Sequence, residues 1–370
     1  MLMDPDPDQQ FFRDTTARFL TEHAPVGELR RLRHDPVGYT PDYWRKGADL
    51  GWTSLLVSDA NGGGTISGEG LVDLTLVAHE FGAHAAPGPL LPVNVVAGTL
   101  SDHPSPEHDA LLRGLLNGST TAAWCAATDS LEVRSDGDEL VISGTVRPVE
   151  AAADADTIVV TGRTDGGLTT VCVPRDTPDV DVRPLQTVDL TRRFAEVSFG
   201  GARVPASAAI GGVGDAAAAA ERMRLRALVI AAAESVGAMQ AAFDMTLEWA
   251  FDRYSFGRPL ASYQELKHRF ADMKMWLEAS SAVTAAAAVA VEHDEPDAGE
   301  LASVAKAYVG EFGAELVQDC VQLHGGIGVT FEHDLHLLLR RVVVNRGLLG
   351  TPAEHLRQIA TTFIAREDVA

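Results

Sequence analysis

Arginine, glutamine and glycine residues in the last third of this 370-residue chain form three short segments that could bind a ligand. The first segment, DRYSFGRPLASYQ, places Arg253 at the end of one apolar helical pattern and Gln264 at the start of the next. A guanidinium can bond to two phosphate oxygens at once, and an amide can bond to a neighbouring ligand group. A helix C-terminus also favours an arginine because of the helix dipole. Phosphate binding and helix termination therefore both remain open for Arg253.

The other two segments combine glycine with helix ends. QLHGGIG begins with Gln322 and places Gly325 and Gly326 directly after a long helical pattern. Two adjacent glycines permit a left-handed helix cap, and they also let a ligand approach the backbone closely. LLGTPAEH contains Thr351, a candidate N-cap whose helix would present backbone amides to an anion. Taken singly, helix capping is the simpler explanation of both segments.

A general base could come from Glu234, which stands alone in the alanine-rich run AAAESVG. A carboxylate isolated in an apolar helix is a candidate proton acceptor, because catalytic carboxylates often lie in such surroundings. The alternatives are that Glu234 lies on a helix surface or is one partner of a buried ion pair.

Helical segments before and after a run of strands in the sequence would have to position these residues. Apolar residues recur at helical spacing up to Leu116 and again from Asp215, whereas short β-branched runs separated by turn residues begin near Thr120. We therefore predict an α+β chain. Its expected parts are an N-terminal all-α domain (1–117), a small antiparallel β domain (118–213) and a C-terminal four-helix bundle (214–370).

Two apolar stripes at helical spacing carry the prediction of the C-terminal bundle. Asp297 and Glu300 form a D-x-x-E pattern, which predicts a capping box at the start of the second stripe. The stripes comprise Met239, Phe243, Leu247 and Phe251, and then Leu301, Ala305, Tyr308, Phe312, Leu316, Cys320 and Leu323.

Composition excludes several classes of function. The formal net charge of −22 argues against nonspecific nucleic-acid binding, although a few arginines can still hold phosphates locally. The most apolar stretch, 227–242, contains Glu234 and Gln240 and is short for a bilayer, so we expect no membrane association. The N-terminus shows no signal-peptide pattern. The three cysteines form no metal-binding motif, which favours a reducing, cytoplasmic location.

In their order and spacing, the three segments resemble the acyl-CoA dehydrogenase family, through its R-x-x-F-G and Q-x-x-G-G motifs. The stretches 58–90 (SDANGGGTISGEGLVDLTLVAHEFGAHAAPGPL) and 188–207 (VDLTRRFAEVSFGGARVPAS) resemble that family's N-terminal and β domains. The resemblance implies an all-α, β, all-α fold that forms dimers or tetramers and binds FAD across a subunit interface.

The resemblance also implies roles for single residues. Thr351 would lie beside the flavin of its own subunit. Six residues would contact the adenosine and diphosphate half of the FAD of the neighbouring subunit: Arg253, Phe256, Gln264, Gln322, Gly325 and Gly326.

The chain departs from the family where the flavin ring and the catalytic base would lie. In many members the Glu of an E-G-T sequence removes an α proton while a β hydride passes to the flavin. The resemblance places that base at Leu349, and the alternative base position of a family subset falls on Ala227. Neither can accept a proton. The family's Trp-x-Thr contacts to the flavin fall on Pro148 and Glu150, and the stretch 124–130 lacks the usual Gly-Ser-Asp.

This combination resembles the non-catalytic β-type subunit of an α2β2 heterotetramer, as in actinobacterial dehydrogenases of steroid and bulky-acyl degradation. The chain would contribute FAD contacts to a homologous catalytic subunit that desaturates an acyl-CoA, with an electron-transfer flavoprotein as the implied acceptor. Three alternatives remain. The chain could be a self-sufficient dehydrogenase or oxidase with Glu234 as base, a flavin monooxygenase-like relative, or a cofactor-free scaffolding subunit.

Overall fold

Helices precede and follow a central run of strands in the structure, a computed structural model that describes residues 5–126 and 128–367. This order confirms the predicted fold class, while Ala127, within the 124–130 stretch, lies outside the described residues. The helices before the sheet are α1 (Pro7–His23), α2 (Val26–Arg31), α3 (Pro41–Asp49), α4 (Gly70–Ala83), α5 (Leu90–Asp102) and α6 (Asp109–Leu116). The helices after it are α7 (Ala217–Asp252), α8 (Gln264–Glu292), α9 (Ala298–His324), α10 (Leu335–Gly347) and α11 (Pro352–Glu367), with the short 3-10 helix η6 (Gly325–Val329) after α9.

The chain divides into two compact units, each made of separate stretches of sequence. The first, here called the helical unit, combines Met1–Glu28, Thr75–Ala86 and Leu228–Ala370. The second, here called the sheet unit, combines Leu29–Leu74 and Pro87–Ala227. The domain boundaries at 117 and 213 remain a prediction.

The sheet unit contains a mixed sheet with the strand order β6-β7-β3-β2-β4-β5-β8, and β1 pairs with β4. The sheet differs in one detail from the predicted small antiparallel domain, because β4 runs parallel to both β1 and β2. The β2–β3 hairpin lies between β1 and β4 in the chain, which gives the connection enough length for a parallel return. The strands are β1 (Ala122–Cys125), β2 (Leu131–Asp136), β3 (Glu139–Glu150), β4 (Thr157–Thr164), β5 (Gly167–Pro174), β6 (Val180–Leu185), β7 (Phe194–Pro205) and β8 (Ala209–Ile210).

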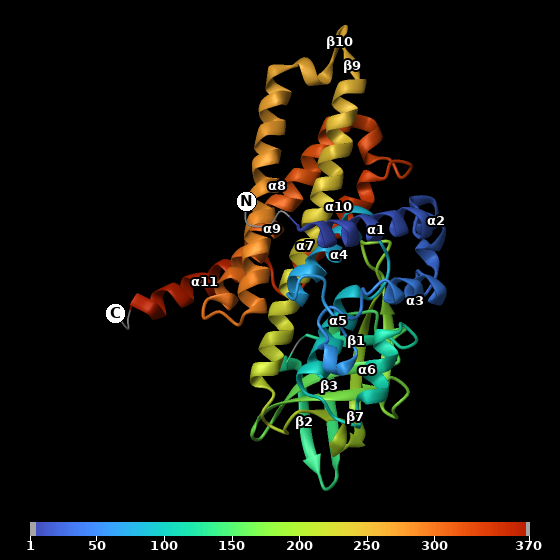
Figure 1. Cartoon of the computed structure of the whole chain (residues 1–370), viewed down its shortest axis with the longest axis vertical. Helices are drawn as coiled ribbons and strands as arrows, with labels where there is room; N and C mark the ends of the chain where they lie inside the picture. Colours follow the sequence, from blue (N-terminus) through green and yellow to red (C-terminus); the bar gives the residue numbers. More distant parts are fainter. Residues whose placement is uncertain (1–4, 127, 368–370) are drawn as a thin grey trace. The chain divides into compact units, whose positions relative to one another are not determined.

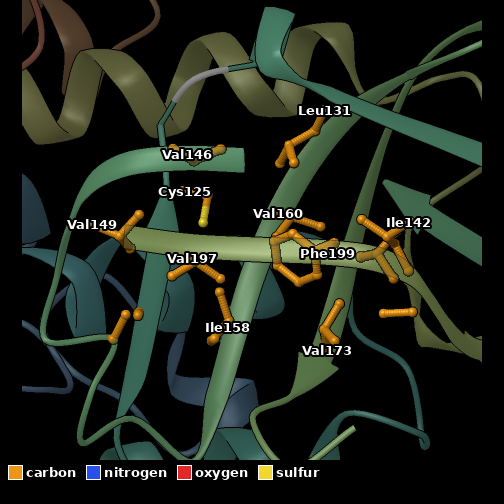
Figure 2. Packing of buried hydrophobic residues seen from close by; sticks show 14 of the residues in the cluster. Cys125, Leu131, Ile142, Val146, Val149, Ile158, Val160, Val173, Val197 and Phe199 are labelled. Atoms are coloured by element: carbon orange, nitrogen blue, oxygen red, sulfur yellow. The ribbon is translucent and has the colours of Figure 1, made fainter. Parts of the chain in front are cut away.

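An aliphatic cluster on the sheet forms the core of this unit (Figure 2). Ile142, Val160 and Val197 come from three different strands and are fully buried, and the Phe199 ring lies among them. Burial of this kind stabilises by roughly 25 cal/mol for each Å² of apolar surface removed from water. The β-branched runs of the sequence therefore form this core.

In the helical unit, α9 packs against α8, α10 and α11. The predicted stripes face the interior for most of their length, since Met239 and Leu316 are fully buried, but Phe251 at the end of α7 is 62% exposed. The predicted capping box at the start of α9 is wrong: the Asp297 side chain makes no capping hydrogen bond. The Glu300 carboxylate instead pairs with Arg366 of α11 at 2.6 Å.

Helix α7 is longer than the apolar stretch that the sequence analysis compared with a bilayer. By length and composition alone it could cross a membrane, but 78% of its most apolar window is buried inside the protein. Its apolar character is therefore that of a core helix, and the argument from shortness was wrong for this helix.

Candidate functional site

A two-residue hairpin joins α7 to α8 and carries the first predicted segment (Figure 1). Its strands, β9 (Tyr254–Ser255) and β10 (Arg258–Pro259), pair antiparallel. Both loop residues have a positive φ, 48° for Phe256 and 80° for Gly257, as in a type I′ turn. The Tyr263 hydroxyl donates a hydrogen bond of 2.7 Å to the Ser255 carbonyl and fixes the base of the hairpin.

Phe256 combines backbone strain with complete exposure. A left-handed conformation costs a non-glycine residue roughly 1–2 kcal/mol, and 99% of the Phe256 side chain is exposed. Among the residues that the structure describes, none covers the Phe256 ring, so the arrangement points to a ligand or partner that covers it. Arg253 and Gln264, also exposed, flank the hairpin at the ends of α7 and α8.

The second predicted segment closes α9 and is also exposed. Gln322 lies in its last turn, and Gly325 caps the helix with a φ of 65°. A Cβ added at Gly325 or Gly326 would meet no other atom within 4 Å. Packing against the described residues therefore does not require glycine at position 326. The exposed backbone at Gly326 is open to close approach by a ligand.

Trp249 and His324 bring these two segments together, and sequence reasoning missed them. Their rings stack with centroids 5.3 Å apart. The sequence offers one signal for Trp249: it stands four residues before Arg253, and this spacing places two side chains on one helix face.

The third predicted segment forms the turn between α10 and α11, where Leu349 and Gly350 have φ values of 59° and 100°. The Lys306 Nζ holds this turn by donating to the Arg346 carbonyl at 3.1 Å and the Gly350 carbonyl at 2.8 Å. Burial lowers the pKa of Lys306 to about 8. His355 Nε2 donates to the Leu349 carbonyl at 2.9 Å. The turn is thus well fixed, but the side chain that it presents at position 349 is a hydrocarbon.

Thr351 is an N-cap, as the sequence predicts, and Glu354 completes a capping box that was not predicted. The Thr351 hydroxyl and backbone N–H both donate to Glu354 Oε2, at 2.8 and 2.7 Å. The backbone hydrogen bond from Thr351 is the largest cause that lowers the pKa of Glu354. The Thr351 hydroxyl therefore donates within the helix end, and its contact with a flavin stays a prediction.

Glu234 is one partner of a buried ion pair. Arg341 Nη1 donates to Glu234 Oε1 at 2.5 Å, and Asn345 Nδ2 donates to Glu234 Oε2 at 2.9 Å. Arg341 also donates to the Ala86 carbonyl at 3.0 Å and is fully buried. Because both carboxylate oxygens accept hydrogen bonds from a buried cation or amide, this geometry does not favour Glu234 as a general base.

The sheet unit contains a second ion pair. It involves Glu150, one of the two positions at which the resemblance to the family places contacts with the flavin. Arg192 forms a bidentate pair with Glu150, and the two side chains are only 3% and 12% exposed. The guanidinium carbon lies 5.3 Å from the Phe194 ring centroid. The adjoining pocket measures about 20 Å³, which is room for about one water molecule.

These observations test whether the residues fit FAD. A guanidinium, two amides, an aromatic ring and an open glycine backbone suit a diphosphate and an adenosine, and the helical unit exposes all of them. Leu349 does not suit a catalytic base, and the buried Glu150–Arg192 pair does not suit contacts with a flavin ring. The chain therefore fits one half of FAD and does not fit the other.

Thiol chemistry is not available at neutral pH. Cys125, Cys172 and Cys320 are free and buried, and burial raises the pKa of each to about 12. A thiolate is the reactive form, so these thiols are inert. Within residues 5–126 and 128–367, no group of three or more His, Cys, Asp or Glu could hold a metal ion.

Comparisons with known proteins agree with the motifs. The family model for the acyl-CoA dehydrogenase N-terminal domain matches residues 6–119, and that for the C-terminal domain matches residues 212–364. The chain is 30% identical to the acyl-CoA dehydrogenase IpdE2 of Mycobacterium tuberculosis over 358 residues, which cover 96% of this chain and 98% of that protein.

Solved structures give the same result. A variant of the Tcur3481–Tcur3483 steroid ACAD is 26% identical, with a TM-score of 0.88 over 98% of this chain and 99% of that chain. A glutaryl-CoA dehydrogenase of Mycobacterium smegmatis in complex with FADH2, 20% identical, has the same fold, with a TM-score of 0.86 over 97% and 95% of the two chains. FAD is thus a cofactor of the family. This chain belongs to the acyl-CoA dehydrogenase family.

Proposed function

We propose that this chain is the non-catalytic subunit of a heterotetrameric acyl-CoA dehydrogenase. It binds the adenosine and diphosphate half of the FAD that a homologous catalytic subunit holds. One observation carries the proposal: the helical unit exposes ligand-type residues, whereas the base position is Leu349 and the Thr351 hydroxyl is bonded to Glu354.

Each exposed residue has a chemical task in this proposal. Arg253 binds diphosphate oxygens, Gln264 and Gln322 bond to the adenosine, and Phe256 packs against it. When bound, FAD accepts the β hydride of the substrate. The carboxylate that removes the α proton belongs to the catalytic subunit, because Leu349 cannot accept a proton.

The relatives support a bulky acyl-CoA as substrate. One similar solved structure is described as a steroid ACAD and carries two names, Tcur3481 and Tcur3483. A steroid-type acyl-CoA, a cytoplasmic location and an electron-transfer flavoprotein as acceptor complete the proposal. Three free, buried cysteines are consistent with a reducing compartment.

The test is a comparison of flavin content and acyl-CoA desaturation for the chain alone and for the chain co-expressed with homologous catalytic candidates from its own genome. We expect little FAD on the lone chain, but about one FAD for each pair of chains and dehydrogenase activity in the complex. A full flavin complement and turnover by the lone chain would contradict the proposal.

An arginine variant separates the proposed role from that of a scaffold. Arg253→Ala in the co-expressed complex should raise the Kd for FAD by about tenfold or more, because a charged contact to the diphosphate is lost. The control is Arg113→Ala, which removes an exposed arginine of α6 in the sheet unit. A scaffolding subunit would show unchanged FAD binding in both variants.

A further inference from the structure

A stack of side chains joins the two segments that the proposal places on FAD. Trp249 of α7 and His324 of α9 stack with their ring planes 15° apart. The guanidinium carbon of Arg253 lies 5.8 Å from the centroid of the Trp249 ring. His333 packs edge-on against His324, with the ring centroids 4.6 Å apart. The stack therefore runs from the hairpin end of α7 to the residue before Gly325.

His324 is the fixed member of this stack. Its side chain is 5% exposed, and its Nδ1 bonds to the Cys320 carbonyl at 2.8 Å. A carbonyl can only accept, so Nδ1 carries the proton. Burial also lowers the pKa of His324, which favours the neutral ring. A fixed ring directly before Gly325 sets the position at which the exposed glycine loop starts.

We propose that Trp249 and His324 are positioning residues for FAD, because their stack sets the spacing between Arg253 and the Gly325–Gly326 loop. Diphosphate and adenosine are covalently joined, so two protein segments bind them together only if the spacing of the segments is held. The inference rests on the proposed function and adds two residues that need not touch the cofactor.

The experiment measures the Kd for FAD of the complex, by flavin fluorescence after the cofactor has been removed and titrated back. Trp249→Leu and His324→Leu remove the stack, and Trp249→Phe and His324→Phe retain an aromatic ring. We expect each leucine variant to raise the Kd by about tenfold and each phenylalanine variant to stay near wild type. Size-exclusion chromatography checks that every variant still assembles.

A matched control is Trp276→Leu. Trp276 of α8 stacks on Phe312 of α9 at 5.6 Å, so its loss removes a comparable ring from the same unit. Trp276 adjoins neither FAD segment in sequence. The Kd of the Trp276→Leu complex for FAD should therefore be unchanged. Wild-type FAD binding by the Trp249→Leu complex would overturn the inference, and so would equal weakening by leucine and phenylalanine. If Arg253→Ala also leaves FAD binding unchanged, the proposed function itself fails.

Discussion

Burial decides what the charged side chains of this protein do. Arg341 is fully buried and pairs with Glu234, whereas Arg253 is exposed beside a strained hairpin. A buried charge needs its partner in the folded state, because desolvation without pairing costs several kcal/mol. An exposed arginine contributes little to stability and remains available to bind phosphate.

Removal of Glu234 should therefore destabilise the chain. Glu234→Ala leaves the Arg341 charge buried without its carboxylate, and we expect the free energy of unfolding to fall by about 3–5 kcal/mol in urea denaturation. The exposed Glu248→Ala on the same helix is the control and should change it by less than about 0.5 kcal/mol. If Glu234→Gln instead abolished turnover by a lone, stably folded chain, Glu234 would be a base.

Lys306 should give the protein a measurable pH dependence. Its folded-state pKa of about 8 lies below the ordinary lysine value of 10.5. Between these values the unfolded chain binds more protons, so the free energy of unfolding rises with pH. We expect a rise on the order of 1–3 kcal/mol from pH 8 to 10 relative to Lys306→Met. The control is Lys274→Met, which changes an exposed lysine and should keep the wild-type rise of the free energy of unfolding with pH. If Lys306→Met showed the same pH dependence as the wild type, the prediction would be contradicted.

At the scale of elements, two short turns carry residues on which the proposed function rests. The β9–β10 hairpin exposes Phe256 in a strained conformation, and the α10–α11 turn holds Leu349 with Lys306 and His355. The second turn is held in place although it lacks a catalytic side chain. The strain in the first is stored at a surface that the lone chain leaves uncovered.

Phe256→Asn should separate stability from cofactor binding. Asparagine tolerates a left-handed conformation, so the lone chain should gain up to about 1 kcal/mol in thermal unfolding. The complex should bind FAD more weakly, because the ring is lost. Phe256→Ala removes the ring without relieving the strain and should weaken FAD binding without the gain. Unchanged FAD affinity in both variants would assign the ring another role.

At the scale of the whole molecule, the net charge of the chain is negative, whereas the residue proposed to bind phosphate is positively charged. The chain carries a net charge of −22, yet the proposed site binds a diphosphate through Arg253. Acidic side chains far from Arg253 repel the diphosphate only weakly, because salt screens exposed charges beyond about 8 Å at physiological ionic strength. A partner that covers Phe256 and shares its FAD would make the stability of each chain depend on the concentration of the other.

The sequence by itself determined the order of elements and the family, because apolar periodicity and strong local motifs such as R-x-x-F-G act over a few residues. It also located Leu349, Thr351 and the exposed ligand-type residues. Only the tertiary structure decided the partners of the charges: Glu234 with Arg341, Glu150 with Arg192, and Glu300 with Arg366. Each pair joins residues far apart in the chain, and local spacing carries no information on such contacts. For the same reason the Trp249–His324 stack became visible only when α7 and α9 were placed side by side.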